Sequence, residues 1–138
     1  MDRLLGLDVG EKRIGIAVSD PLKITAQGLE NYNRKETEQA DFEYFAEIIK
    51  EKNVSLIVCG NPLNMNGSFG PQAEKVHAFG DKLSSELGIP IAYWDERLTS
   101  MEVERIMIDA DVSREKRRKV TDMLAAMRIL QSYMDANC

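Results

Sequence analysis

The stretch RLLGLDVGEKRIGIAVS (3–19) decides the expected fold. Two apolar runs, 3–9 and 13–19, flank a short polar turn that contains Gly10. Apolar runs of this length on either side of a glycine-containing turn are typical of a β-hairpin. The first run carries a carboxylate, Asp8, close to its end. We therefore expect a hairpin whose first strand ends on an acidic side chain.

The segments that follow the hairpin predict a third strand and then a helix. Residues 24–32 form a weaker apolar run, and Gly28 within it marks a bulge or an edge strand. Residues 36–52 place apolar side chains at helical spacing with acidic side chains opposite, which is typical of an amphipathic helix. Asn33, with Glu36 three residues later, is the expected N-cap.

The middle of the chain alternates between strand and helix. Residues 54–59 are almost wholly apolar, as in a buried central strand, and a loop rich in glycine and asparagine follows over 60–70. Residues 71–87 open with proline, a residue favoured in the first helical turn, and Gly88 ends this predicted helix. Residues 89–94 are again apolar and predict a fifth strand.

The end of the chain predicts helix. Thr99 with Glu102 has the spacing of a capping box. Residues 113–134 predict the last helix, and Ala125 and Ala126 within it are small enough for a close approach to a sheet.

The element order is β-β-β-α-β-α-β-α, which predicts an α/β fold. We expect a mixed five-stranded sheet, with three antiparallel strands followed by parallel additions and with helices on both faces. That topology is the ribonuclease H-like arrangement. The chain has 138 residues, 43% hydrophobic and 30% charged. This length and composition predict a single domain over residues 1–138.

The net charge of −5, from 18 basic and 23 acidic residues, is unevenly spread. Residues 36–51 carry a net charge of −5, and residues 112–120 carry +4. A negative total argues against a nucleic-acid partner, whereas a compact basic segment favours one. The distribution of charge therefore leaves nucleic acid open as a partner.

Cysteine usage and hydropathy favour a cytoplasmic protein. The two cysteines, Cys59 and Cys138, form no disulfide framework and fit a reducing compartment. The first residues lack the pattern of a signal peptide, and no apolar run approaches the ~20 residues that span a bilayer. We expect no membrane association.

Three carboxylates occupy positions where sequence context is otherwise apolar: Asp8, Glu96 and Asp122. In the expected sheet the ends of the first and fifth strands lie close together, and the last helix can lean over them. Converging carboxylates repel unless a cation neutralises them. Oxygen ligands of this kind suit Mg²⁺ or Mn²⁺, and two such ions can clamp the attacking and leaving oxygens of a phosphodiester. The three acids thus predict metal-dependent phosphodiester hydrolysis.

Each carboxylate also has a plainer interpretation. Asp8 could hydrogen-bond the turn that follows it. Asp95 or Glu96 could pair with Arg97 at a rim. Asp122 could pair with Arg118, four residues earlier on a helix. Only the combination of the three favours a catalytic site.

Four motifs together resemble the YqgF/RuvX family, ribonuclease H-like bacterial proteins related to RuvC Holliday-junction resolvases. They are GLDVGEKRIGIAVSD (6–20), GNPLNMNGSFGPQA (60–73), DERLTS (95–100) and KVTDMLAAMRILQSYM (119–134). The resemblance implies that Asp8, Glu96 and Asp122 are the catalytic and metal-binding acids. It also implies that the 60–70 loop and the residue after Pro71 lie beside the site, through Asn61, Gly67, Gly70 and Gln72.

Five basic side chains are candidate contacts to substrate phosphates. Lys12 and Arg13 lie in the hairpin next to Asp8, and Arg97 follows Glu96. Arginine suits a bidentate grip on phosphate. Arg117 and Arg118 belong to the basic segment, where positive charge opposes the dipole of the expected helix. Ordinary surface charge is the alternative for all five.

The resemblance implies a metal-dependent endonuclease, with 5′-end maturation of pre-16S rRNA as the leading function. The expected partner is structured RNA or branched DNA, and the protein would be a monomer or a homodimer. The alternatives are a Holliday-junction resolvase-like DNA nuclease and a non-catalytic nucleic-acid-binding protein of ribosome assembly or transcription. The opening hairpin also resembles the phosphate hairpin of sugar-kinase and actin-like ATPases. Those proteins need a second lobe, and no GxxxxGK[ST] loop occurs here.

Overall fold

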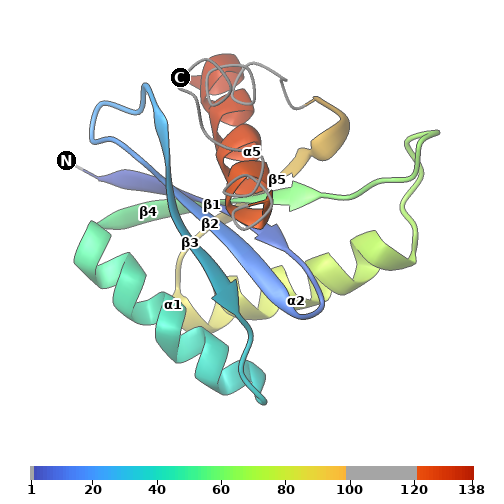
Figure 1. The fold of residues 1–138 in the computed structure, drawn as a ribbon, viewed down its shortest axis with the longest axis horizontal. Coiled ribbons are helices and arrows are strands. Elements are labelled where there is room, and N and C mark those ends of the chain that lie inside the picture. The colour runs from blue at the N-terminus through green and yellow to red at the C-terminus, as the bar shows by residue number, and fades with distance from the viewer. Residues whose placement is uncertain (1, 99–120) are drawn as a thin grey trace.

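A mixed sheet forms the centre of the molecule (Figure 1). The computed structural model describes residues 2–98 and 121–138, and within them five strands lie in the order β3-β2-β1-β4-β5. The elements are β1 (Arg3–Val9), β2 (Arg13–Ser19), β3 (Ala26–Asn33), α1 (Glu38–Lys52), β4 (Val54–Asn61), α2 (Pro71–Leu87), β5 (Ile91–Asp95), the 3₁₀ turn η1 (Glu96–Leu98) and α5 (Thr121–Asn137). The first three strands are antiparallel and β4 and β5 add in parallel, as predicted.

The hairpin of β1 and β2 forms as predicted and brings β1 to the middle of the sheet. Val9 pairs with Ile14, and the N–H of Gly10 donates to the carbonyl of Arg13 at 2.9 Å, which closes the turn. Because β1, β4 and β5 are parallel, their carboxyl ends meet at one edge of the sheet. That edge carries Asp8 and leads directly into η1.

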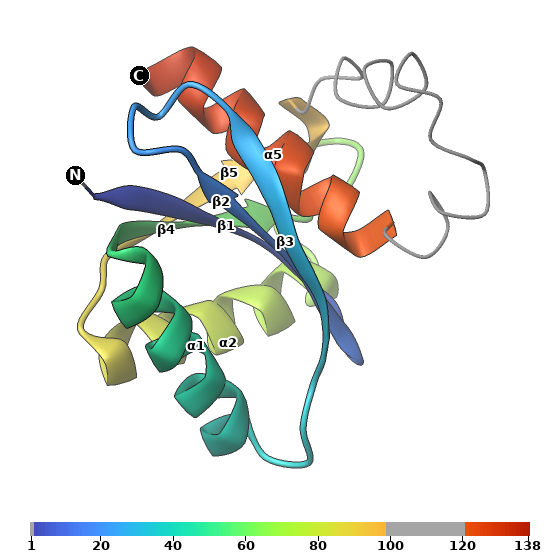
Figure 2. The ribbon, with the colours of Figure 1, turned by 60° about the vertical axis from the view of Figure 1, so that its left-hand side comes forward.

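Helices cover both faces of the sheet, as Figure 2 shows. On one face α1 and α2 pack on Leu5, Leu7 and Val9 of β1 in the larger core. On the other face α5 crosses β1, β2 and β3, with Leu130 and Ile129 in a smaller core. Since side chains alternate along a strand, Asp8 points to the α5 face.

The start of α1 differs from the prediction. Asn33 lies in β3, and the N-cap is Thr37, whose hydroxyl accepts from the N–H of Ala40 at 3.2 Å. The β3 pairing with β2 runs to Asn33, so that residue is committed to the sheet. The register of that pairing shifts next to Gly28, which confirms the predicted bulge. The helix α2 begins at proline and ends before a glycine in the left-handed region, as predicted.

Asp41 departs from the expected acidic outer face of α1. Its side chain is 1% exposed and accepts hydrogen bonds from the Tyr32 hydroxyl at 2.7 Å and the N–H of Lys35 at 2.8 Å. Arg34 donates to its second oxygen at 3.4 Å. Asp41 therefore ties the connection between β3 and α1 into the core.

Two expectations lie outside the described residues. They are the capping box of Thr99 and Glu102 and the first turns of the last helix, including Arg117 and Arg118. Among the residues that are described, no helix is long and apolar enough to cross a membrane.

Candidate active site

Two carboxyl groups meet at the edge where the parallel strands end. Asp8 is the second-last residue of β1, and Glu96 follows directly after β5. Strand β4 lies between them, and Gly60 of β4 leaves room for the Glu96 side chain: a Cβ there would lie 3.1 Å from its carboxyl carbon. Asp8 and Glu96 form a hydrogen-bonded pair.

Burial and mutual repulsion keep this pair from ionising fully. Burial raises the pKa of Asp8, the hydrogen bond with Glu96 lowers it, and the charge of Asp122 raises it. Burial, followed by the charge of Asp8, raises the pKa of Glu96 to about 7. Near neutral pH the two carboxyls therefore hold a proton between them, which is the condition of paired acids that lack a neutralising cation.

The third acid, Asp122, lies beside the pair but is tied to a different partner. Its Oδ2 accepts a hydrogen bond from Nε of Arg13, the first residue of β2, at 3.1 Å. The start of α5 is held where the N–H of Met123 donates to Asn31 Oδ1 at 2.8 Å. The charge of Asp122 still reaches Asp8 and raises its pKa. The sequence suggested Arg118 as the partner of Asp122, whereas in the structure Asp122 pairs with Arg13.

Arg128 is a site residue that the sequence interpretation missed. It lies on α5 next to Ile129, whose side chain approaches Gly60, and its Nε is buried. The charge of Arg128 lowers the pKa of both Asp8 and Glu96. The available signal was a single arginine within the apolar run MLAAMRIL (123–130). A buried cation on that face of the helix has to lie near compensating acids.

Arg97 joins the end of β5 to the long loop. Its guanidinium pairs with Asp95, with Nη2 2.7 Å from Oδ2, and Nη1 donates to the carbonyl of Met65 at 3.2 Å. Gly67, in the left-handed region, packs against the same guanidinium. The Asp95–Arg97 rim pair, one of the plainer interpretations, is therefore present. Arg97 fixes the loop beside the acids.

The other loop candidates take different places. Asn61 ends β4, and its Oδ1 lies 3.2 Å from Nε2 of His77, which stacks on Tyr93. Gly70 is the N-cap of α2. Gln72 and Lys12 line a cavity on the opposite face of the sheet from α5. Of the candidate residues, Asp8 and Glu96 are in contact, and Arg13 and Asp122 adjoin them.

The donor set suits a hard divalent cation in part. Asp8 and Glu96 offer adjacent carboxylate oxygens, the ligands that Mg²⁺ and Mn²⁺ prefer, and a cation would relieve the repulsion that raises their pKa values. Within residues 2–98 and 121–138, however, no three acidic, histidine or cysteine side chains lie close enough to hold one ion together. Asp122 would have to turn from Arg13 to join the pair.

Comparisons with known proteins agree on one family. The profile of the RuvX family, described as Holliday junction resolvase, matches residues 2–136. The chain is 54% identical over 134 residues to a protein of Halalkalibacterium halodurans named "Putative pre-16S rRNA nuclease", covering 96% of each chain. It is 53% identical over 133 residues to the protein of that name from Clostridioides difficile, covering 96% of this chain and 94% of the relative.

Solved structures agree on the fold. Thermus thermophilus RuvC in complex with a Holliday junction substrate superposes with a TM-score of 0.66 at 11% identity, over 99% of this chain and 95% of that one. The yeast mitochondrial Holliday junction resolvase gives a TM-score of 0.53 at 13% identity, over 96% of this chain and 78% of that one. The predicted ribonuclease H-like fold is confirmed, and the chain belongs to the RuvX family.

Proposed function

We propose that this protein is a cytoplasmic, Mg²⁺- or Mn²⁺-dependent endonuclease that hydrolyses phosphodiester bonds in structured RNA. Asp8, Glu96 and Asp122 are its catalytic acids and the residues that would hold the metal. The observation that carries the proposal is the half-buried Asp8–Glu96 pair at the carboxyl edge of the sheet. Family membership over nearly the whole chain supports the same reaction.

Each side chain of the site has a role in this reaction. A bound Mg²⁺ or Mn²⁺ would supply the positive charge that stabilises the transferring phosphate. Glu96 would hold the metal together with Asp8, and the bound cation would favour the ionised form of both carboxyls. Arg13, with 57% of its side chain exposed, pairs with Asp122 in this structure and would be available to a phosphate of the substrate once Asp122 turns to the metal. Arg97 orients the loop at the rim of the site.

Pre-16S rRNA is the proposed substrate, with maturation of its 5′ end as the step. The support is the name carried by relatives that are about half identical to this chain. The second candidate substrate is a four-way DNA junction, which the family description favours. A monomer or a homodimer fits either substrate.

The test is cleavage of two labelled substrates, the 5′ region of pre-16S rRNA and a four-way DNA junction. Each is incubated with Mg²⁺, with Mn²⁺ and with chelator. We expect metal-dependent cleavage of the RNA and a loss of about a thousandfold in Asp8→Asn. Asp135→Asn, an exposed change near the far end of α5, is the matched control and should cleave normally.

The competing functions give different results in the same assay. Cleavage of the junction but not of the RNA would identify a DNA resolvase. Tight binding without cleavage under either metal, unchanged in Asp8→Asn, would identify a non-catalytic binding protein. Equal cleavage by Asp8→Asn and the unmodified protein would remove the proposed site.

A further inference from the structure

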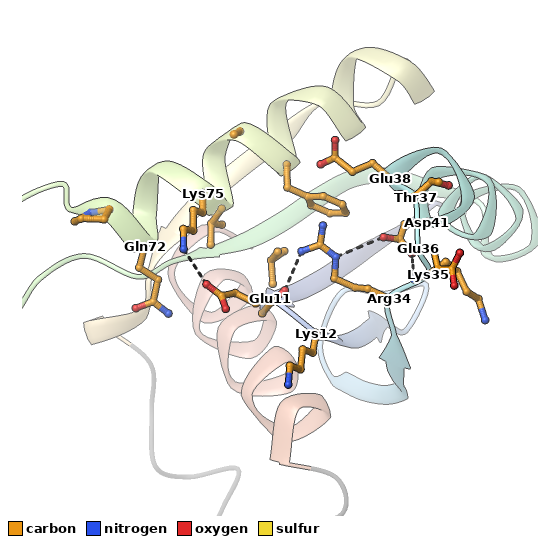
Figure 3. A pocket seen from close by; sticks show the side chains of 16 residues that line it. Glu11, Lys12, Arg34, Lys35, Glu36, Thr37, Glu38, Asp41, Gln72 and Lys75 are labelled. Atoms are coloured by element: carbon orange, nitrogen blue, oxygen red, sulfur yellow. Dashed lines mark hydrogen bonds and ion pairs between the residues drawn. The ribbon is translucent and has the colours of Figure 1, made fainter.

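A cavity of about 890 Å³ lies on the α1–α2 face of the sheet, away from α5 (Figure 3). It lies between the turn that joins β1 to β2 and the first turns of α1 and α2. Val9 and Gly10, the residues directly after Asp8, form part of its lining. Its volume falls within the ~300–1,000 Å³ of cavities that hold small organic groups. The proposed reaction gives this cavity no role.

We propose that the cavity seats a nucleotide of the substrate strand, close to the phosphate that is cleaved. This inference rests on the proposed function and adds a place for the unpaired part of the substrate. We favour a nucleotide of the substrate strand over a free nucleotide, because the first lining residues, Val9 and Gly10, directly follow Asp8 in the chain. Asp8 points to the α5 face, so a strand bound there would pass over the turn at Gly10, which lines the cavity, to reach it.

One lining side chain, Arg34, offers a flat guanidinium that is held in place and has 20% of its side chain exposed. The guanidinium of Arg34 lies over the Phe79 ring, 4.6 Å from its centroid. Arg34 Nε donates to Asp41 at 3.4 Å, and Nη1 donates to the carbonyl of Gly10 at 3.0 Å. Figure 3 shows these contacts converging on Arg34 from both sides. Unpaired bases stack on aromatic rings and on guanidinium planes of this kind, largely without sequence preference.

The charged side chains of the lining leave two lysines available to a phosphate. The lining holds four cationic and four acidic side chains, and three of the acids already have cationic partners. The pairs are Glu11 with Lys75, Glu38 with Lys82, and Asp41 with Arg34. Lys12 and Lys35 form no ion pair within the described parts of the chain, and Glu36 is the remaining acid. The lining as a whole is therefore neutral, and Lys12 and Lys35 are the lining cations available to a phosphate.

Lys75 can supply a third cation to the phosphate when a substrate arrives. Its ion pair with Glu11 is 2.8 Å long, with 69% and 76% of the two side chains exposed. Such pairs contribute little to stability and open readily. Lys75 can then turn to a phosphate that lies between the hairpin and α2.

The experiment compares RNA duplexes with and without a short single-stranded tail at either end. Binding is measured by fluorescence anisotropy in an Asp8→Asn background, so that no probe is cleaved. Ala78→Trp fills the cavity from an exposed position on its lining, and Ser85→Trp is the control at an exposed position of α2 outside it. We expect a tail to tighten binding about tenfold, and Ala78→Trp to remove that gain while blunt duplexes bind unchanged. Ser85→Trp should keep the gain.

Equal affinity of Ala78→Trp and Ser85→Trp for the tailed duplexes would overturn the proposal. A titration with free AMP and UMP tests the other source of a nucleotide. Binding of the free nucleotide that Ala78→Trp blocks, with no effect of a tail, would also overturn the strand proposal. Failure of the proposed function appears separately, as absence of cleavage of any probe by the otherwise unmodified protein with Mg²⁺ or Mn²⁺.

Discussion

The Asp8–Glu96 pair places two half-buried acids side by side, and burial together with the charge of Asp8 raises the pKa of Glu96 to about 7. Two arginines lie next to these acids. The charge of Arg128 on α5 lowers the pKa of both Asp8 and Glu96, and Arg13 of the hairpin forms an ion pair with Asp122. The acids were predictable because a carboxylate inside an apolar run is conspicuous. Their partners were not, since Arg13 and Asp122 are brought together only by the way α5 crosses the hairpin.

The raised pKa of Glu96 predicts a pH dependence of stability in the metal-free protein. The folded pKa of about 7 exceeds the usual 4.5, so the folded state binds more protons than the unfolded chain between these values. The free energy of unfolding should fall as pH rises through this range. Glu96→Gln should remove about 1–2 kcal/mol of that fall, allowing for the part of the side chain that water screens.

Urea denaturation in chelator from about pH 4.5 to about pH 8 measures this dependence. Glu86→Gln, an exposed change on α2, controls for the loss of a carboxyl group. A Glu96→Gln profile that runs parallel to that of the unmodified protein would show that the pair is not protonated in the fold.

Arg128 should stabilise the fold mainly when the acids ionise. Arg128→Met removes the cation, and its cost should be about 1–3 kcal/mol greater at about pH 8 than at about pH 5. Arg128→Lys keeps the charge and should recover most of the difference. Chemical denaturation of the three proteins at both pH values measures it. A cost for Arg128→Met that is the same at both pH values would mean that Arg128 acts through packing alone.

At the scale of elements, the position of α5 decides whether Asp122 reaches the site. The helix begins directly over Gly15 of β2. The approach is so close that a side chain at Gly15 would overlap the backbone carbonyl of Asp122. The hydrogen bond from Met123 to Asn31 then fixes its first turn over β3. Periodicity predicted the existence and type of each described strand and α-helix, but not the 3₁₀ turn η1. It could not predict which residue caps α1 or how closely α5 packs, because those depend on contacts between distant segments.

Gly15→Ala should displace the first turn of α5. We expect a loss of about 2–4 kcal/mol in the free energy of unfolding, together with loss of cleavage, because Asp122 moves with the helix. Gly88→Ala, where the backbone has positive φ but a Cβ meets open space, should cost about 1 kcal/mol and leave cleavage intact. Urea denaturation and the cleavage assay measure both effects. Equal stability and activity of Gly15→Ala and the unmodified protein would contradict this packing.

The N-cap of α1 can be tested in the same way. Thr37→Ala should cost about 1 kcal/mol, because the N–H of Ala40 loses its acceptor. Asn33→Ala should change stability by less than about 0.5 kcal/mol, since Asn33 is an exposed residue at the end of β3. Thermal and urea denaturation distinguish the two. A larger loss of stability in Asn33→Ala than in Thr37→Ala would indicate that Asn33, as predicted from the sequence, is the N-cap of α1.

At the scale of the whole molecule, a net charge of −5 accompanies a nuclease-family fold. The acidic residues of 36–51 lie mostly on α1, on the opposite face of the sheet from α5. Two basic residues, Lys12 and Arg13, lie at the hairpin turn between the proposed catalytic acids and the cavity. The topology could be predicted from the order of elements, whereas the cavity could not, because its lining comes from three separate segments. That residues 1–138 form a single domain stays a prediction.

In the proposed reaction the Asp8–Glu96 pair cleaves RNA with a divalent metal. The most direct measurement is the single-turnover cleavage rate on the 5′ region of pre-16S rRNA at saturating Mg²⁺ and protein, in parallel with RNA affinity. Asp8→Asn and Glu96→Gln should each lower the rate about a thousandfold while RNA affinity stays within about threefold. Rates in both variants within about twofold of the unmodified protein would contradict the account.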